Sequence, residues 1–323
     1  METVSGSNNW KIVFRRENGG VTLLQAVTCD KKAALPRELF GLPVTALAHH
    51  ALAPNRVVPA GEQMQITCGP VGGEWDNSKL EELHLPDTLT RADDYAFYNC
   101  GKLKTLYLSD SLCRWGGGAL MNCRELNTFH LTCRGQEGEV LRDLGDELPG
   151  ELDVTLHYAD GNTARLILPE YTEIHEENVP HHQFDFHIVG AGYPYHHCFR
   201  QGKFNLREYD DLWKGFLCKG HEEDCALRLV WWRLRYPLDL SDGAREDYLI
   251  YLRSHTADAA RWRLRERDAA GLQFLLRETE PTRELLAQLC AEARAYDAPE
   301  TLAVLLEEQH CRFPAGAEKT FDL

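Results

Sequence analysis

Apolar residues recur along residues 79–131 with a fixed spacing. Residues 79–101 (KLEELHLPDTLTRADDYAFYNCG) align without a gap on residues 102–124 (KLKTLYLSDSLCRWGGGALMNCR), which gives an offset of 23 residues, and a third copy covers residues 125–131. Within each copy the order L-x-x-L-x-L predicts a short strand, because alternate residues of a strand point to the same face. One such coil cannot bury its apolar edge alone. We therefore expect neighbouring copies to stack into a short solenoid.

The repeat resembles the leucine-rich repeats of the BspA type. The residues that carry the resemblance are LEELHLPDTLTRADDYAFYNC, and residues 35–53 look like the entry coil of the same family, before an insertion from about Pro54 to Ser78. The resemblance implies a bacterial repeat protein, and surface or adhesion roles are common in the family. The start of the chain has no basic stretch followed by an apolar run. We therefore expect no signal peptide, a cytoplasmic location and no adhesion role.

The pattern changes in the middle of the chain. Residues 152–171 alternate between apolar and polar on both sides of Asp160-Gly161, which predicts a β-hairpin with Asp-Gly in its turn. Residues 182–190 predict a further strand. The sequence leaves two arrangements open, because these strands either extend the solenoid sheet or form a small separate one.

From about Glu208 onward the apolar positions follow the helical period. One helical stripe is formed by Tyr209, Leu212, Trp213 and Phe216. Three later segments open with Asp242, Asp268 and Asp297, and Asp is a common residue at helix starts. Their spacing predicts helix pairs in a loose array. An uncharacterised helical C-terminal domain is therefore expected.

Together these patterns predict an α+β chain with three domains. Residues 1–135 form the leucine-rich-repeat solenoid, residues 136–205 form a β-rich, histidine-dense connector with its hairpin, and residues 206–323 form an all-helical domain.

Charge and composition exclude some classes of protein. The chain has 50 acidic against 35 basic residues, a net charge of −15, whereas a protein that coats DNA or RNA needs a basic surface. The arginines of residues 261–267 spread around a helix among acids, so we expect a solvated, ion-paired face there. No stretch of 18 apolar residues occurs, so no membrane span is expected.

The eleven cysteines do not form a recognisable framework. Their number is odd, their spacing is scattered and no C-x-x-C pair occurs, so we expect reduced thiols. Cys100 and Cys123 hold equivalent positions in the repeat. Small, buried core positions are the best interpretation of this pair.

Six of the 14 histidines lie close together near Cys198: His175, His181, His182, His187, His196 and His197. Imidazole is a common metal ligand, but these spacings match no metal site that we can justify, so we assign no metal and no cofactor. Cys198 beside His197 lacks a group that orients the base and an oxyanion pocket, so no catalytic residue is assigned. A hydrolase-like or metal-dependent enzyme with a site in residues 175–198 is kept as the alternative function.

The leading hypothesis is a non-enzymatic protein–protein interaction module, because solenoids expose an extended face. The residues that alternate with the buried leucines should point out from the concave strand face, and they are Glu82, His84, Thr105, Tyr107, Thr128 and His130. Aromatic residues contribute much of the energy of interfaces. Residues 1–200 carry a net charge of −10 and residues 201–323 carry −5. The expected partner is a basic or polar protein or peptide, and neither nucleic acid nor a membrane.

Overall fold

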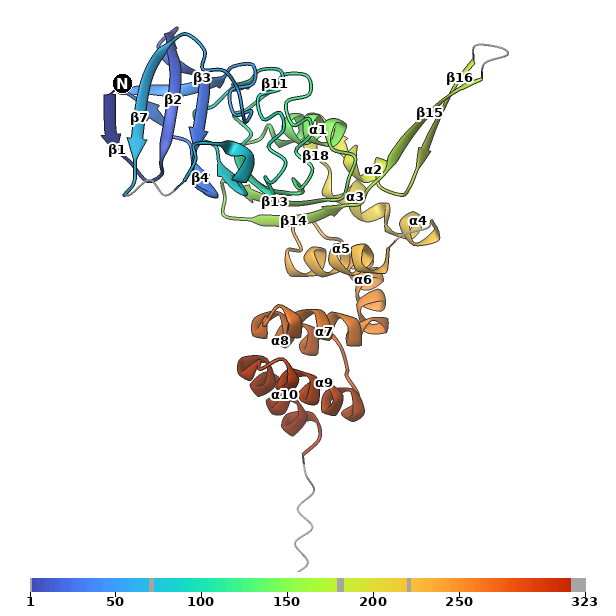
Figure 1. Ribbon diagram of the computed structural model, residues 1–323. Coiled ribbons are helices and arrows are strands. Elements are labelled where there is room, and N and C mark those ends of the chain that lie inside the picture. Colours follow the sequence, from blue (N-terminus) through green and yellow to red (C-terminus); the bar gives the residue numbers. More distant parts are fainter. Residues whose placement is uncertain (1, 70–72, 179–182, 220–221, 315–323) are drawn as a thin grey trace, which may run out of the picture. The chain divides into compact units, whose positions relative to one another are not determined.

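The computed structural model describes residues 2–69, 73–178, 183–219 and 222–314 (Figure 1). The chain divides into two compact units, Met1–Cys225 with Tyr236–Asp239, and Ala226–Arg235 with Leu240–Leu323. The described part of the chain is α+β, with its sheets in the first unit and a helical C-terminal region. The finer division at residues 135 and 205 stays a prediction.

The repeated strands lie side by side in a six-stranded sheet. Its order is β14-β13-β12-β10-β8-β4, with β4 at Lys32–Ala34, β8 at Glu82–His84, β10 at Thr105–Ser109, β12 at Thr128–Cys133, β13 at Leu152–Tyr158 and β14 at Thr163–Leu168. From β4 to β13 the neighbours are parallel. The register places Leu83 beside Leu106 and Leu106 beside Phe129, all fully buried. The 23-residue repeat therefore sets both the strands and their register.

Residues 35–53 and the first two copies of the repeat each also contribute a strand to a second sheet, which has eight strands. These are β1 (Glu2–Ser5), β2 (Trp10–Glu17), β3 (Gly20–Thr28), β5 (Glu38–Leu39), β6 (Leu42–Leu47), β7 (Glu62–Thr67), β9 (Arg91–Ala92) and β11 (Arg114–Trp115). Strands β6, β9 and β11 are parallel neighbours. The expected insertion at residues 54–78 contains β7, which pairs with β2. Part of the insertion, β7, is therefore built into the sheet, which its sequence alone did not indicate.

A chain of backbone hydrogen bonds joins the return segments of successive repeats. The amide of Leu52 donates to the carbonyl of Ala96 (2.8 Å), and the equivalent amide of Phe97 donates to Ala119 (2.9 Å). Leu52 thus takes the position that Phe97 holds in the next copy, while the resemblance of residues 35–53 to the entry coil of the family stays a prediction. The same periodicity places Asn99 and Asn122 in left-handed conformation, each with φ of 63°. Asparagine tolerates that conformation better than most residues.

The last repeat is closed by helix α1 (Glu137–Glu147), which the β-rich assignment of residues 136–205 did not anticipate. No following repeat offers a carbonyl to the amide of Leu120, the equivalent of Phe97. The carboxylate of Glu147 accepts there instead, with Oε2 at 2.8 Å from the amide of Leu120 and Oε1 at 3.0 Å from that of Ala119. Glu147 thus completes the hydrogen-bond chain with a side chain.

The cysteines of the repeat are core residues, as their equivalent positions predicted. The Cys100 thiol donates to the carbonyl of Leu52 (3.4 Å), and the Cys123 thiol donates to the carbonyl of Phe97 (3.2 Å). Burial raises the pKa of Cys123 to about 12. All eleven cysteines are free thiols.

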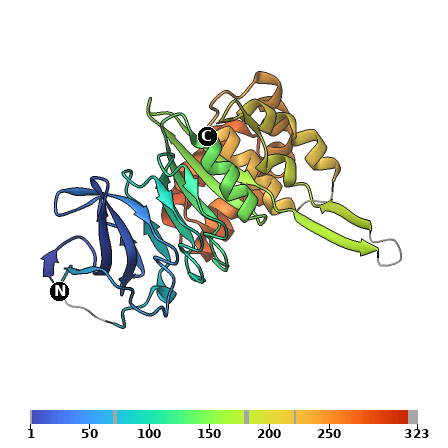
Figure 2. The same cartoon turned by 90° about the horizontal axis from the view of Figure 1, so that it is seen from above.

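The predicted hairpin is confirmed, and the structure decides between the two arrangements that the sequence left open. Strands β13 and β14 are antiparallel around Gly161, whose φ is 86°, and β13 pairs with β12. The hairpin therefore extends the six-stranded sheet. The further strand, β16 (Gln183–Val189), pairs instead with β15 (Thr172–Asn178) in a separate two-stranded arm that extends away from the two larger sheets (Figure 2).

Short elements complete the first unit after the arm. They are α2 (Tyr193–His196), β17 (Phe199–Arg200), β18 (Lys203–Phe204), α3 (Leu206–Asp211) and α4 (Trp213–Cys218). The predicted helical stripe is buried at Tyr209, Trp213 and Phe216. The Tyr209 hydroxyl donates to the carbonyl of Ile167 in β14 (2.7 Å), which ties α3 to the sheet.

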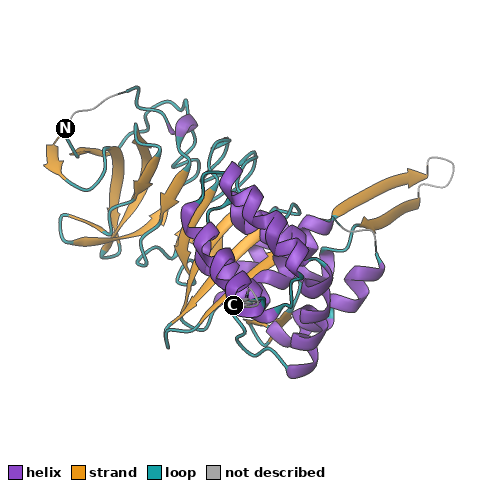
Figure 3. Ribbon diagram, turned by 90° about the horizontal axis from the view of Figure 1, so that it is seen from below, coloured by secondary structure: helices purple, strands orange, loops and turns teal. Residues whose placement is uncertain are grey.

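The second unit consists, in its described residues, of helices and the short segments that connect them (Figure 3). Its helices are α5 (Glu223–Arg235), which begins in the first unit, and α6 (Asp242–Ser254), α7 (Thr256–Arg265), α8 (Ala269–Glu278), α9 (Arg283–Ala295) and α10 (Pro299–Arg312). Two of the three expected starts are correct: α6 begins at Asp242 with Ser241 as its cap, and Asp268 caps α8. Asp297 does not cap α10, which follows Ala298 without a side-chain cap.

Candidate binding surface

The structure brings the six predicted contact residues together on one face of the six-stranded sheet. Glu82, Thr105 and Thr128 are in register in one row, and His84, Tyr107 and His130 are in register in the row beside it. All six side chains are half-buried, while the residues between them, Leu83, Leu106 and Phe129, are in the core. The geometry that the alternation predicted is therefore present. The two large sheets are open, and the solenoid and its concave face stay predictions.

The second row is a stack of aromatic rings, which we call the ring ladder. The His84 and Tyr107 rings lie 3.9 Å apart at 5° between their planes, and the Tyr107 and His130 rings lie 4.3 Å apart at 6°. Equal 23-residue offsets in a parallel sheet produce this stack, because equivalent side chains are direct neighbours. The ring faces cover one another. What remains to contact another molecule is the polar edge of each ring, a hydroxyl or a ring nitrogen.

The ladder continues onto the hairpin through His157, which the sequence analysis missed. Nδ1 of His130 lies 3.4 Å from Nε2 of His157, and the ring centroids are 5.7 Å apart. The two ring planes are nearly parallel, at 16°, so His157 extends the ladder by a looser contact than those between its first three rings. Burial, followed by the charges of His157 and Arg165, lowers the pKa of His130.

Two ion pairs border the rows at opposite edges of the sheet. Glu82 accepts from Lys32 (2.8 Å) and contacts Nε2 of His84 (3.0 Å), and the hydrogen bonds from both lower its pKa. Asp153 accepts two hydrogen bonds from the guanidinium of Arg165, at 2.8 and 2.7 Å. Each carboxylate thus has its own cation. The surface between them is polar and nearly neutral.

The histidine-rich segment does not assemble a comparable site among the described residues. His181 and His182 lie outside them, His175 is in β15, and His187 is exposed on β16. His196 lies in α2 and His197 follows it. The described residues contain no group of three or more His, Cys, Asp or Glu that could hold a metal ion.

Cys198 and His197 do not contact each other in the way that a nucleophile and its base would. The Cys198 thiol donates to the carbonyl of Pro194 (3.1 Å), and burial raises its pKa to about 12. His197 Nδ1 lies 2.7 Å from the carbonyl of Tyr193, and Nε2 lies 3.4 Å from Asp146. The thiol is thus protonated and donates its hydrogen to a carbonyl, so no thiolate is present for nucleophilic attack.

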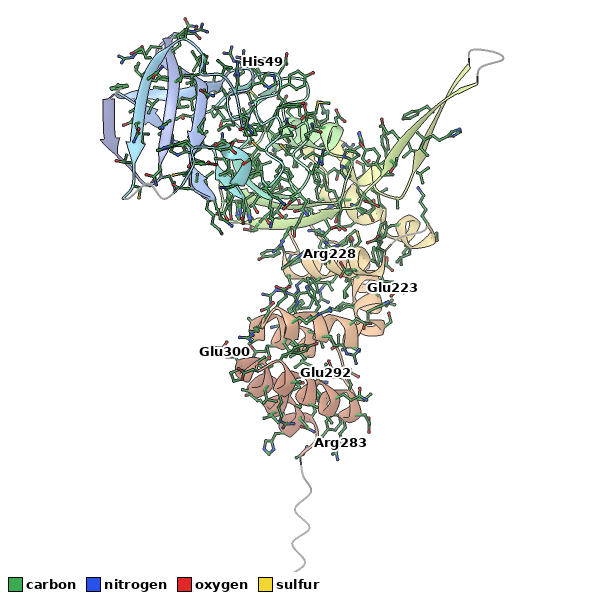
Figure 4. The ribbon with its side chains drawn as sticks, in the orientation of Figure 1. His49, Glu223, Arg228, Arg283, Glu292 and Glu300 are labelled. Atoms are coloured by element: carbon green, nitrogen blue, oxygen red, sulfur yellow. The ribbon has the colours of Figure 1, made fainter. Side chains whose placement is uncertain are left out.

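The arginine-rich segment is ion-paired, although not all of it is solvated. Arg261 contacts Glu292 of α9 at 3.2 Å (Glu292 is labelled in Figure 4). Arg263 is buried, contrary to expectation, because its guanidinium stacks on the Trp262 ring (3.4 Å from the centroid) and pairs with Asp268 (3.0 Å). In these pairs the acids offset the positive charge of the arginines, which binding to a nucleic-acid phosphate would require.

Comparison with known families bears on the repeat. Residues 74–137 match the family model described as BspA type leucine rich repeat region (6 copies). The leucine-rich repeat thus contains β8 to β12, which carry the six predicted contact residues. No curated protein matches the chain, and no solved structure matches it. No helix in the described parts of the chain is long and apolar enough to cross a membrane. The cytoplasmic location and the bacterial origin stay predictions.

Proposed function

We propose that this chain is a non-enzymatic protein-binding module that holds a polar or basic segment of another protein on the face of the ring ladder. The observation that carries the proposal is the in-register stack of His84, Tyr107 and His130, which the ring of His157 continues. Leucine-rich repeats commonly bind proteins, and their regular strands present one row of side chains to a partner. The match over residues 74–137 supports this class of function.

The chemistry of the surface indicates what kind of contact it makes. The ring faces are covered, and Nε2 of His84 and Nδ1 of His130 already contact Glu82 and His157. The Tyr107 hydroxyl and the second ring nitrogen of each histidine are therefore the groups through which a partner would be hydrogen-bonded. The carboxylates of Glu82 and Asp153 are already paired with Lys32 and Arg165. Recognition at the ladder is therefore by hydrogen bonds. The net charge of −10 on residues 1–200 attracts a basic partner over a longer range.

Affinity capture with a matched control tests the proposal. The full chain, the ladder variant His84→Ala/Tyr107→Ala/His130→Ala and the control variant His49→Ala/His50→Ala/Tyr95→Ala are compared as baits, with quantitative mass spectrometry of the captured proteins. The control removes the same residue types from a second ring cluster, in which His50 and Tyr95 are 5.3 Å apart. At least one protein should be captured by wild type and control but lost by the ladder variant. Equal recovery by all three baits would contradict the proposal.

A more conservative variant distinguishes the loss of a contact with the partner from a loss of the chain's own structure. Tyr107→Phe keeps the ring between His84 and His130 but removes the hydroxyl. We expect it to melt close to wild type and to bind the captured partner roughly five- to tenfold more weakly, the cost of one hydrogen bond of ordinary strength. Purified partner and isothermal titration calorimetry measure this effect. Unchanged affinity would show that the hydroxyl edge makes no contact.

A further inference from the structure

The two-stranded arm is too small to bury its own large apolar side chains, and several of them are exposed. Four large apolar residues on it are exposed, namely Ile174 (36%), Phe186 (50%), Ile188 (38%) and Val189 (54%). An isolated two-stranded hairpin is at best marginally stable in water, and stable sheets gain a third strand or a covering layer. The arm therefore resembles an element whose burial is completed by another chain.

The register shows that both faces of the arm carry apolar residues. Opposite residues in an antiparallel pair share a face, and the register pairs Glu173 with Ile188 and Ile174 with His187. Phe186 and Ile188 thus lie two apart on one face of β16, and Ile174 and Val189 lie on the other face. A strand added to the edge of the arm would contact apolar residues with both of its own faces.

Charge complementarity selects the occupant. Residues 170–190 contain five acidic residues and no lysine or arginine; the acids are Glu170, Glu173, Glu176, Glu177 and Asp185. A second copy of this chain would bring the same negative charge against the arm, and like charges on adjacent strands destabilise their pairing. A segment with lysine or arginine is attracted instead.

We propose that the β15–β16 arm binds an extended segment of another protein in which apolar and basic residues alternate, and that this segment pairs with the arm as a third strand. Main-chain hydrogen bonds at an open sheet edge supply affinity in this mode, and the side chains at alternate positions supply selectivity. The arm is a different surface from the ring ladder. Its partner is independent of the proposed function, and either proposal can fail without the other.

A defined probe tests the proposal with the full chain. The probe is a fluorescently labelled peptide of alternating lysine and valine, and binding is measured by fluorescence anisotropy. Two control peptides are used: one with the same residues in a lysine block followed by a valine block, and one of alternating glutamate and valine. The alternating lysine peptide should bind most tightly, and its binding should weaken as salt is raised. Hydrogen exchange should slow in residues 172–178 and 183–189 when it binds.

Variants place the binding on the arm. Phe186→Ser/Ile188→Ser should weaken the alternating lysine peptide roughly tenfold or more, because two apolar contacts are lost while the charge is unchanged. The matched control is Val57→Ser/Val58→Ser, which removes two apolar side chains that are 88% and 59% exposed elsewhere in the first unit. This control and the ladder variant should bind the peptide like wild type.

Several outcomes would overturn the proposal. They are failure of the alternating lysine peptide to bind, equal binding of either control peptide, and equal loss of binding in the arm and control variants. Sedimentation velocity tests the other possible occupant of the arm, a second copy of this chain. If the chain dimerises and Phe186→Ser/Ile188→Ser abolishes the dimer, the arm binds a second copy and the proposed partner is wrong.

Discussion

His196, at the end of α2, is a buried imidazole whose surroundings determine its protonation. Nε2 lies 2.9 Å from the carbonyl of Pro169, so Nε2 carries the proton and donates it. Nδ1 is buried without a hydrogen-bond partner. Burial therefore lowers the pKa of His196 to about 4, because it disfavours the charged form more than the backbone of Pro169 and its neighbours favours it.

The consequence is a loss of stability in acid that one substitution should remove. An unfolded histidine has a pKa near 6.5, so the unfolded chain binds more protons here between pH 6.5 and 4. Stability is complete above that window and falls as the pH drops through it, by up to about 3 kcal/mol for this residue. His196→Gln keeps a donor for Pro169 and does not titrate. Urea unfolding at several pH values should give this variant a shallower decline of the free energy of unfolding than wild type.

The same substitution at exposed His310 provides the control, since it changes the residue type without changing the buried site. It should leave the decline of stability with pH as it is in wild type. Equal declines in wild type and His196→Gln would show that His196 does not make this contribution.

At the scale of secondary-structure elements, prediction succeeded where the interactions repeat and failed where they join distant segments. The alternation in residues 79–131 predicts β8, β10 and β12, because equal offsets leave one register that buries every leucine. It does not predict β7, whose partner β2 lies some 50 residues earlier in the chain. Nor does it predict α1, although Val140, Leu141 and Leu144 have helical spacing and are buried.

The residues of the candidate surface fall into the same two groups, those that the repeat predicts and those that depend on contacts between distant segments. Its six predicted residues lie in three successive copies of the repeat, two in each, and follow from alternation alone. His157 and Asp153 join the surface only because β13 is parallel to β12, and a hairpin sequence does not state which sheet it extends. Arg165 then follows from the antiparallel pairing of β14 with β13. The local chemistry was therefore predictable, whereas the border of the surface needed the register between distant strands.

Helix α1 gives rise to a prediction about the end of the repeat. Without Glu147 the amides of Ala119 and Leu120 lose an ionised acceptor at 3.0 and 2.8 Å. Hydrogen bonds to charged groups contribute about 1.5–3 kcal/mol each, so Glu147→Ala should lower the free energy of unfolding by roughly 2–4 kcal/mol. Glu147→Gln retains one acceptor oxygen and should lose less. Urea unfolding measures both effects.

The control is Glu139→Ala, which removes an exposed glutamate from the first turn of the same helix. It should cost under about 1 kcal/mol, the typical value of an acidic residue near a helix start. Hydrogen exchange adds a local measurement, since exchange at residues 119 and 120 should quicken in Glu147→Ala alone. Unchanged exchange at both amides would contradict the capping role.

At the scale of the whole chain, residues 1–200 carry two thirds of the net negative charge. Residues 1–200 hold 27 acidic residues and residues 201–323 hold 23, yet their net charges are −10 and −5. In the second part Arg261 and Arg263 pair with acids, which compensates charge within the helices. The ring ladder and the arm both belong to the more negative part. A basic partner should therefore be drawn toward the part of the chain that carries both proposed surfaces.

Binding of polylysine tests this long-range electrostatic attraction separately from any specific contact. At low salt it should bind the full chain, and zero-length carbodiimide crosslinks should favour the carboxylates of residues 1–200 beyond their small excess in number, with the preference fading as salt screens the charges. Labelled duplex DNA should not bind under the same conditions. Arg265→Glu serves as the check on residues 261–267: DNA binding that this variant abolishes would reveal a nucleic-acid surface on α7. Crosslinks spread in proportion to the number of carboxylates would show that the uneven net charge does not steer a basic partner.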